Sequence, residues 1–456
     1  MARNLAPNVL FVFGDQWRGQ AVGYRGDPNA RTPHVDRFAA ESVDLPNAVA
    51  GTPVCCPWRA SLMTGQHPLT HGVFVNDVCI TSDAVPLAEC LNQAGYATSY
   101  IGKWHVDGQG REAFVPPERR LGFRTWRGFE CSHDYNASDY YADTPERQRW
   151  AGYDAEAQTR LACEQIRDHD RERPFALFLS WGPPHDPYQT APERYRQNYR
   201  PEDIILRPNV PAEAAGQARQ WLAGYYAHIE ALDACFGDLL AALRAAGCEE
   251  NTIVVFTSDH GDMLGSQGLW MKQKPWEESL RVPFLVRWPA ALGRQPRQVD
   301  ACLNAPDIMP TLLGLCGVPI PATVQGTDAS PWLRGEAGPD LDAALLALHF
   351  PFHQWNPERG GKEFRGLRTR RYTYCRDLQG PWLLYDNQAD PFQAVNRIAD
   401  PALAAVRADL DQRLGLELRR IGDEFLPGTE CLRRRGVRLG PSGDIAIYRD
   451  RGPYDG

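Results

Sequence analysis

The segment that decides the fold of this chain is Asn8-Val9-Leu10-Phe11-Val12-Phe13-Gly14-Asp15-Gln16. Its apolar part is nearly continuous and rich in Val and Phe, as is typical of a strand that is covered on both faces. Four more runs have this character, at residues 97–101, 175–180, 252–257 and 284–287. Strands of this kind occur mainly in parallel sheets between helices, so these runs predict a large, mostly parallel central sheet.

Helical patterns separate the predicted strands. In residues 212–246 the apolar side chains recur at helical spacing, and they are Leu222, Tyr226, Ile229, Leu232, Phe236, Leu240 and Leu243. Strands that alternate with helices predict an α/β sandwich. The sequence contains no internal repeat and no low-complexity tract.

The composition changes near residue 335, where Arg334-Gly335-Glu336-Ala337-Gly338-Pro339-Asp340 is typical of a linker. We therefore predict a main domain over residues 1–335 and a smaller C-terminal α+β domain with a tail over residues 336–456. Two strand-like pieces at 368–375 and 382–385 and a helix at 402–421 make up the smaller domain. The tail after Gly428 is rich in Arg and Gly and predicts no element.

Composition and charge limit the classes of partner. The chain has 456 residues, 43% hydrophobic and 23% charged, with a formal net charge of -8. This balance is that of a globular protein and argues against nucleic acid or an anionic membrane as the partner. No window reaches the ~20 apolar residues of a membrane-spanning helix, and the short run Val9–Phe13 does not fit a secretory signal. Twelve scattered cysteines indicate a reducing compartment, so we expect a cytoplasmic protein.

Polar residues follow the predicted strands where each strand ends. In open α/β sheets the carboxyl edge of the strands is where ligands bind, so these residues are candidates for one shared site. They are Asp15-Gln16, Lys103-Trp104-His105, His185-Asp186 and Asp259-His260.

A further segment reads Cys55-Cys56-Pro57-Trp58-Arg59-Ala60-Ser61-Leu62-Met63-Thr64-Gly65. Taken alone, a Cys-x-Pro-x-Arg run is more often a buried cysteine pair before a helix. The longer segment resembles the sulfatase motif, Cys-x-Pro-Ser-Arg followed by Thr-Gly, whose first cysteine is oxidised to formylglycine. The resemblance assigns the modification to Cys55, since Cys56 occupies the variable position. Trp58 departs from the usual Ser or Ala.

Other segments are similar to the same family, and together the resemblance spans about residues 8 to 395. It implies an alkaline-phosphatase-like fold and a hydrolase that cleaves a sulfate monoester of a carbohydrate, an aryl group or a small alkyl group. It also makes residues 1–335 the catalytic domain. The similar segments are Asp15-Gln16, Gly102-Lys103-Trp104-His105, Pro184-His185-Asp186-Pro187, Ser258-Asp259-His260-Gly261, Gly268-Leu269-Trp270-Met271-Lys272, Arg281-Val282-Pro283 and Tyr385-Asp386 with Asp390-Pro391.

The resemblance also implies the site chemistry. One divalent cation is expected at Asp15, Gln16, Asp259, His260 and the modified Cys55. Mostly oxygen ligands favour Ca²⁺, whereas the imidazole suits Mn²⁺. A formylglycine-generating enzyme is the expected maturation partner.

Roles for the other residues follow from the same resemblance. Arg59 is expected to steady the formylglycine, and Lys103 and Lys272 to neutralise sulfate oxygens. His105 is expected to help the intermediate collapse, and His185 to protonate the leaving oxygen. Lys274 is the alternative to Lys272. Asn76 is a candidate substrate ligand, and a turn-capping role for it is an equal alternative.

Several readings compete. A phosphonate monoester or phosphodiester hydrolase of the same superfamily is the nearest, but those enzymes tend to carry Tyr-x-Thr where this chain has Lys103-Trp104-His105. A phosphatase or phosphomutase would need a Ser or Thr nucleophile and two metals. A non-catalytic binding protein would keep Cys55 unmodified. Five aromatic residues are predicted at the rim of the site, where they either stack on the substrate or pack in the core. These rim aromatics are Trp181, His185, Tyr188, Trp270 and Trp276.

Overall fold

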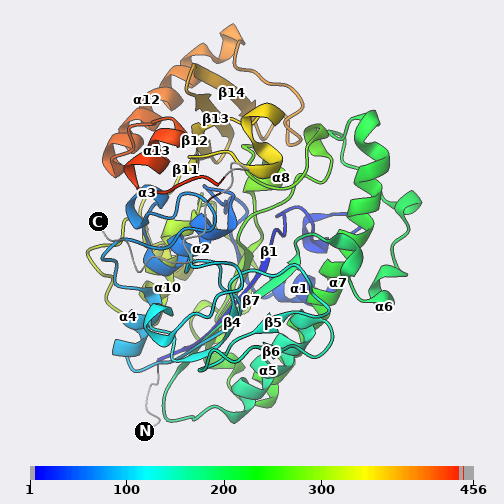
Figure 1. Cartoon of the computed structure of the whole chain (residues 1–456), viewed down its shortest axis with the longest axis vertical. Coiled ribbons are helices and arrows are strands. Elements are labelled where there is room, and N and C mark those ends of the chain that lie inside the picture. Colours follow the sequence, from blue (N-terminus) through cyan, green and yellow to red (C-terminus); the bar gives the residue numbers. More distant parts are fainter. Residues whose placement is uncertain (1–5, 441–444, 446–456) are drawn as a thin grey trace.

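The structure, a computed structural model, describes residues 6–440 and residue 445. Within this range its centre is an eight-stranded sheet in the order β10-β2-β9-β8-β1-β7-β3-β4 (Figure 1). The strands are β1 (Asn8–Asp15), β2 (Val43–Asp44), β3 (Ala97–Lys103), β4 (Thr125–Phe129), β7 (Phe175–Pro184), β8 (Thr252–Ser258), β9 (Phe284–Arg287) and β10 (Arg297–Gln298). All five predicted strands therefore belong to this sheet.

Strand β1 lies at the centre of the sheet and pairs in parallel with β7 and β8. Strand β3 continues the parallel order beyond β7, whereas β9 runs antiparallel to β8 and β2. The prediction of a mostly parallel sheet is thus confirmed. After Asn8, every residue of β1 is buried, which explains why polar side chains are missing from this run until the strand ends.

Helices cover both faces of the sheet (Figure 1). Because neighbouring strand residues point to opposite faces, Val9 and Phe11 join one hydrophobic core and Leu10 and Val12 join the other. The helices of the first core are α2 (Cys55–Thr64), α4 (Leu87–Gln93) and α10 (Ala305–Cys316). Those of the second are α1 (Pro33–Ala39), α5 (Asp154–Asp168) and α7 (Ala215–Ala245).

Shorter elements connect these layers. They are α3 (Pro68–His71), α6 (Glu193–Arg196), α8 (Glu277–Leu280), α9 (Pro289–Leu292), α11 (Ser330–Arg334) and the small strands β5 (Asp139–Tyr140) and β6 (Gln148–Arg149). The predicted helix at 212–246 corresponds to α7, which a turn of 3-10 helix at Ala212–Ala214 precedes. Within the described part of the chain, no helix has the length and apolar character needed to cross a membrane.

A second, antiparallel sheet lies towards the C-terminus, with the order β11-β12-β13-β14. Its strands are β11 (Ala343–Leu348), β12 (Phe364–Thr369), β13 (Tyr372–Asp377) and β14 (Gly380–Asp386), and helices α12 (Ala404–Ile421) and α13 (Gly428–Arg434) accompany them. Leu410, Leu414 and Leu418 of α12 pack against this sheet. The smaller α+β unit of the predicted fold is therefore present.

One predicted strand in this unit is wrong. Residues 368–375 do not form a single strand, because the Thr369 hydroxyl accepts a hydrogen bond from the Tyr372 N–H (2.8 Å) and the chain turns there from β12 into β13. Strand β11 and most of β12 were not predicted. Arg365, in β12, is buried beside Asp423, a pairing that the pattern of apolar residues does not reveal.

The domain boundary at residue 335 stays a prediction. Helix α11 ends at Arg334, and Gly335 follows in the left-handed conformation (φ 80°) that commonly ends a helix. Leu346 and Leu348 of β11 belong to the same hydrophobic core as the helices on one face of the large sheet. The greater part of the predicted tail, residues 441–444 and 446–456, lies outside the described residues.

The fold places a site at one edge of the large sheet. Strands β8, β1, β7 and β3 are neighbours and run in parallel, so their carboxyl ends meet. Gly102 allows β3 to close on β7, because its φ is 103° and a Cβ there would come 2.0 Å from the Ser180 carbonyl oxygen. Lys103 follows directly and ends β3 at this edge.

Candidate active site

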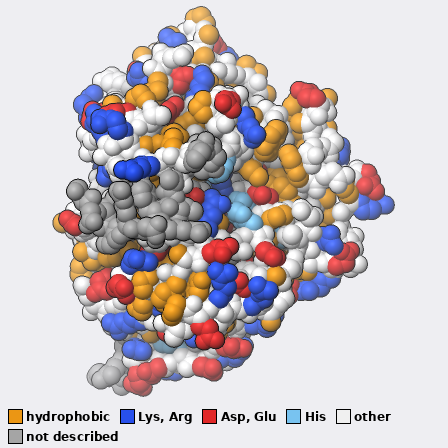
Figure 2. Space-filling view, in the orientation of Figure 1, with side chains coloured by type: hydrophobic (Ala, Val, Ile, Leu, Met, Phe, Trp, Pro, Cys, Tyr) orange, Lys and Arg blue, Asp and Glu red, His pale blue; other side chains and the backbone are white. Residues whose placement is uncertain are grey.

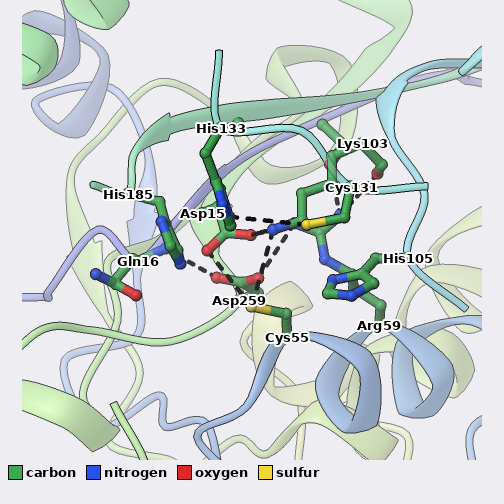
Figure 3. Close-up of polar contacts among 12 residues, drawn as sticks. Asp15, Gln16, Cys55, Arg59, Lys103, His105, Cys131, His133, His185 and Asp259 are labelled. Atoms are coloured by element: carbon green, nitrogen blue, oxygen red, sulfur yellow. Dashed lines mark hydrogen bonds and ion pairs between the residues drawn. The ribbon is translucent and has the colours of Figure 1, made fainter. Parts of the chain in front are cut away.

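Residues from four strands and one helix gather at this edge (Figure 3). Asp15 is the last residue of β1, Lys103 is the last of β3, and Asp259 comes directly after β8. His185 follows β7, and Cys55 is the first residue of α2. All five are buried, with exposed fractions of 6% or less. The sequence-predicted groups thus form one enclosed polar site.

The Cys55 thiol is the point on which charged groups converge. Its Sγ lies 3.2 Å from His260 Nε2 and 3.1 Å from Lys272 Nζ. Asp15 Oδ1 is 3.6 Å from this sulfur, and Lys103 Nζ is 4.0 Å from it. Burial and the Asp15 carboxylate raise the pKa of the thiol. The two lysines and the imidazole lower it more, so the pKa lies well below its usual value and the position favours an anion.

The local backbone explains why Cys55 points into the site. Val54 is extended (φ -147°, ψ 137°) and the helix begins directly after it. Asn76 Oδ1 accepts a hydrogen bond from the Cys56 N–H (3.0 Å), which satisfies one of the free amides of the first helical turn. The partial positive charge at the start of α2 adds to the stabilisation of an anion at Cys55.

Four residues present ligand atoms suited to a metal ion. One ligand atom each from Asp15, Cys55, Asp259 and His260 lies within 4.8 Å of all the others, and all four residues are buried. His260 Nδ1 lies 3.0 Å from the Gly261 carbonyl oxygen. If Nδ1 carries the proton, this contact leaves the Nε2 lone pair directed at the group, an orientation common among metal-binding histidines. The donor set therefore fits a divalent cation.

Gln16 lies beside this group with its side chain fixed. Its Nε2 donates to Asp262 Oδ2 (2.6 Å), and its Oε1 accepts from Lys272 Nζ (3.3 Å). Its backbone N–H donates to Asp259 Oδ1 (2.9 Å). The amide oxygen of Gln16 therefore faces the site interior.

Arg59 joins the two carboxylates of the site. Its Nη2 donates to Asp15 Oδ2 and to Asp259 Oδ2, each at 3.1 Å. Its Nη1 donates to Ser180 Oγ (2.7 Å) and to the Lys103 carbonyl oxygen (2.8 Å). These contacts show Arg59 neutralising buried acids; its expected contact with the modified Cys55 stays a prediction.

Lys272 links Cys55 to His185. Its Nζ lies 2.8 Å from His185 Nε2 as well as 3.1 Å from Cys55 Sγ. On the other side of the ring, His185 Nδ1 lies 3.0 Å from Asp186 Oδ1. Nδ1 also lies 2.9 Å from the Asp186 backbone carbonyl oxygen, which fixes the orientation of the imidazole. Burial raises the pKa of Asp186, but the neighbouring His185 and Lys272 hold it below its usual value.

Lys274, the alternative to Lys272, points elsewhere. Its Nζ donates to the Trp270 carbonyl oxygen (2.7 Å) and lies 4.9 Å from the centre of the Trp355 ring. Burial lowers the pKa of Lys274 to about 7. Of the two lysines, Lys272 is thus the one that reaches Cys55.

His105 and Asn76 make contacts around the site rather than with the Cys55 sulfur. His105 Nε2 lies 3.1 Å from Asp77 Oδ1, and Asn76 supports the start of α2 through the Cys56 N–H. Burial lowers the pKa of His105, but neighbouring thiols and Asp77 raise it well above its usual value. The observed contact of Asn76 is a capping one, and the catalytic role of His105 and the substrate contact of Asn76 stay predictions.

Backbone strain is concentrated around these residues. Gln16 (φ 71°), His105 (φ 59°), Met271 (φ 60°) and Gln273 (φ 75°) adopt left-handed conformations, although none is a glycine. Such conformations cost about 1–3 kcal/mol each and cluster at functional sites. These backbone conformations determine the direction of the Gln16 and His105 side chains and the course of the loop that carries Lys272.

Sequence reasoning missed Cys131 and His133. The His133 ring stacks on the His185 ring, with centres 4.5 Å apart and planes 6° apart. Cys131 Sγ lies 3.7 Å from His133 Nε2. Figure 3 shows both residues beside Lys103 and Asp15. Both residues follow β4, which was not predicted as a strand. If β4 had been predicted, Cys131 and His133 would have been candidate site residues, because binding residues lie at the carboxyl ends of parallel strands.

Asp262 was also missed as part of the site, and Tyr188, one of the predicted rim aromatics, contacts it. Asp262 Oδ2 accepts from Gln16 Nε2 and from the Tyr188 hydroxyl, both at 2.6 Å. Of the rim aromatics, Trp181, Tyr188 and Trp276 are buried, whereas Trp270 is 43% exposed. The first three therefore pack in the protein, and Trp270 is accessible to a ligand.

Comparison with known proteins agrees with this geometry. The Sulfatase family model matches residues 7–318, and a model of the C-terminal part of N-sulphoglucosamine sulphohydrolase matches residues 265–420. An ulvan-active sulfatase from Formosa agariphila is 43% identical, over 97% of this chain and 87% of its own length.

Two solved structures extend the comparison. One comes from work on the metabolism of multiple glycosaminoglycans by Bacteroides thetaiotaomicron. Its TM-score is 0.84 at 30% identity, covering 94% of this chain and 99% of that chain. The other is a phosphonate monoester hydrolase of Agrobacterium radiobacter, with a TM-score of 0.73 at 25% identity, covering 98% of this chain and 100% of that chain.

The alkaline-phosphatase-like fold and the buried polar site define a hydrolase of anionic esters. The chain belongs to the formylglycine-dependent sulfatase family of the alkaline phosphatase superfamily, and its reaction is the hydrolysis of sulfate esters. The family implies a divalent metal ion and a formylglycine made from a cysteine. The predicted fold, family and enzyme class are thereby confirmed.

Proposed function

We propose that the protein removes sulfate from a carbohydrate and that Cys55 is the residue converted to formylglycine. One observation carries the assignment: Cys55 Sγ lies within 3.2 Å of both Lys272 Nζ and His260 Nε2. Cys55 Sγ thus faces Lys272, which also contacts His185, and it faces His260 of the metal-ligand group. The names of the relatives, which refer to ulvan and glycosaminoglycans, support a sugar rather than an aryl or small alkyl group.

The Cys55 sulfur stands in the place of the oxygens of a hydrated aldehyde. Formylglycine, when hydrated, supplies one hydroxyl that attacks sulfur and a second that lets sulfate leave, a release that a thiol does not provide. Every residue of α2 is buried, Cys55 and Arg59 among them. A formylglycine-generating enzyme must therefore reach Cys55 before this part of the chain has folded.

Asp15, Gln16, Asp259 and His260 would hold the cation together with the modified Cys55. The two carboxylates and the inward-facing amide oxygen favour Ca²⁺, and the His260 imidazole makes Mn²⁺ the alternative. When bound, the cation lowers the pKa of the attacking hydroxyl and orients the sulfate.

Lys103 and Lys272 bind the sulfate oxygens in this proposal. Both ammonium groups lie within 4.0 Å of Cys55 Sγ and both residues are buried. In a site that excludes water, fixed positive charges stabilise developing negative charge strongly. Arg59 serves the site in a different way, because it neutralises the Asp15 and Asp259 carboxylates.

His185 is the group that gives a proton to the leaving sugar oxygen. The Asp186 backbone carbonyl oxygen lies 2.9 Å from Nδ1, so Nε2 is the atom that faces the site and transfers the proton. Lys272 contacts the same Nε2 at 2.8 Å and shares the task of neutralising the oxygen. His105, which lies against Asp77, would assist the later release of sulfate.

The rival assignment is phosphonate monoester or phosphodiester hydrolysis, since a phosphonate monoester hydrolase shares the fold. The segment Lys103-Trp104-His105 favours sulfate, because the phosphonate and phosphodiester hydrolases tend to carry Tyr-x-Thr at this place. The Lys103 ammonium lies 4.0 Å from the nucleophile position. The test uses protein made together with a formylglycine-generating enzyme and checks conversion by mass analysis of the Cys55 peptide. Values of kcat/KM are then compared for 4-nitrophenyl sulfate, 4-nitrophenyl phenylphosphonate and bis(4-nitrophenyl) phosphate. Preference for sulfate supports the proposal, and preference for either phosphorus ester contradicts it.

A further inference from the structure

A cavity of about 490 Å³ lies between α6, the 3-10 turn Pro201–Asp203 and the N-terminal half of α7. We call it the Trp221 cavity. This volume is within the range of about 300–1,000 Å³ that is typical of ligand sites. Glutamine and aromatic side chains dominate its wall, and those used below are Tyr188, Gln189, Gln217, Gln220 and Trp221.

The Trp221 cavity adjoins the sulfate site. Tyr188 forms part of its wall, and the hydroxyl of the same residue donates to Asp262 Oδ2, which also holds Gln16. The Trp221 ring contacts the Trp270 ring, with centres 5.7 Å apart. Trp270 is two residues from Lys272, a span of at most about 7 Å along the chain. Tyr188 and the Trp221–Trp270 pair therefore connect the cavity to the rim of the sulfate site.

The molecular surface agrees with this placement. Figure 2 shows hydrophobic side chains gathered beside the histidine side chains of the cleft, on the side towards α7. Trp270 is the most exposed tryptophan of the described chain at 43%, and it lies against Trp221. The two rings offer an apolar platform between the cleft and the cavity.

The polar groups of the cavity suit hydroxyl groups rather than charges. Gln189, Gln217 and Gln220 are exposed, and their side-chain amides make no hydrogen bond to protein among the described residues, so each can donate to and accept from a ligand. The two charged residues of the wall, Glu193 and Arg196, form an ion pair with each other. Their charges cancel, so the wall favours an uncharged ligand.

We propose that the Trp221 cavity binds an uncharged sugar unit next to the sulfated unit of an oligosaccharide substrate. A sugar ring has an apolar C–H face that fits the Trp221 and Trp270 platform, and a rim of hydroxyls that fits the glutamine amides. A uronate or a second sulfate would instead require a cation that is not already paired. This inference rests on the proposed carbohydrate sulfatase activity and defines which carbohydrates extend into the protein.

The test compares pairs of substrates. Galactose and N-acetylglucosamine, each sulfated at a single hydroxyl, are assayed beside trisaccharides in which the same sulfated unit stands between two unsulfated galactose units. For the best pair we expect kcat/KM to be about tenfold higher with the trisaccharide, mainly through a lower KM. Trp221→Ala should remove this gain and change kcat/KM for the monosaccharide and for 4-nitrophenyl sulfate less than about twofold.

Two variants serve as controls. Trp221→Phe keeps an aromatic face and should retain most of the gain, which separates loss of the platform from loss of folding. Gln220→Ala should reduce the gain, whereas Gln379→Ala, which removes an exposed amide from the β13–β14 turn, should leave it intact.

Each outcome decides one question. If 4-nitrophenyl sulfate and the monosaccharide sulfates are hydrolysed but extension brings no gain, or Trp221→Ala keeps the gain, the cavity proposal is wrong and the proposed function stands. Hydrolysis of the aryl sulfate but of no saccharide overturns the cavity proposal as well. A gain that appears only with uronate-flanked trisaccharides shows an anionic ligand and overturns it. No turnover of any sulfate by protein with confirmed formylglycine overturns the proposed function itself.

Discussion

Replacing Lys272 by Met tests the electrostatic core of the proposed mechanism. Met keeps most of the length and volume of the side chain but removes the charge. It also removes the contacts of Nζ with Cys55 Sγ at 3.1 Å, His185 Nε2 at 2.8 Å and Gln16 Oε1 at 3.3 Å. Two unit charges about 4 Å apart attract by about 4 kcal/mol at an effective dielectric constant of 20. Loss of one fixed donor to a developing oxyanion costs about 10²–10³-fold in rate.

We therefore expect Lys272→Met to lower kcat for 4-nitrophenyl sulfate by about 10²–10³-fold, with a smaller change in KM. The matched control is Lys274→Met, two residues away, which removes a second buried lysine whose Nζ contacts Trp270 instead of the site. It should change kcat by no more than about threefold. Formylglycine content and thermal unfolding are measured for both variants. The reasoning is refuted if folded, converted Lys272→Met keeps kcat within about fivefold of the parent, or if both variants lose equal activity.

Three further predictions concern the nucleophile, a buried lysine and the metal. Cys55→Ala should abolish turnover and leave the thermal unfolding temperature nearly unchanged, because one buried sulfur contributes little core volume; an active variant would contradict the nucleophile assignment. Burial lowers the pKa of Lys274 to about 7. Between that pH and about 10.4 the unfolded chain binds a proton that the folded chain lacks. Lys274 therefore makes the free energy of unfolding rise with pH, by at most about 1.4 kcal/mol per pH unit. Urea unfolding at pH 7 to 9 should give a steeper rise of the free energy of unfolding with pH in the parent than in Lys274→Met. Equal slopes would contradict the lowered pKa of Lys274. A chelator should abolish activity and lower the unfolding temperature. Ca²⁺ should restore both, adding about 2.7 kcal/mol at 100 times its dissociation constant, and restoration by Mn²⁺ alone would reverse the choice of metal.

The central sheet could be predicted because its inner strands are covered on both faces. After their first residues, Asn8 and Thr252, strands β1 and β8 lack polar residues almost until they end, so the pattern shows both the strand and its limit. Strand β4 lies at the edge of the sheet, where Thr125 is exposed and Arg127 is half-buried, and its weak pattern was missed. Strand β11 consists of Ala and Leu, which have no preference for strands, and only its pairing with β12 makes it one.

The members of the site were easier to predict than their contacts. Parallel strands carry Asp15, Lys103 and Asp259 to one edge whatever the loops do, so their meeting follows from the fold. The contacts of His105 depend instead on a left-handed backbone at that residue, which turns the ring towards Asp77. No residue pattern specifies such a turn at a histidine. His133 was missed for the simpler reason that it follows the edge strand β4.

The charge balance of the site explains how a chain with a net charge of -8 can bind a sulfate ester. Arg59 contacts both Asp15 and Asp259, and Lys103 contacts Asp15, so the protein already neutralises the two metal-binding carboxylates. Lys272 contacts no carboxylate among the described ion pairs and remains available to an anion. A divalent cation at the same carboxylates would add two further positive charges to a site that is balanced without it. Attraction for sulfate therefore arises within a few ångströms of Cys55, where burial strengthens it, and does not require a positive protein surface.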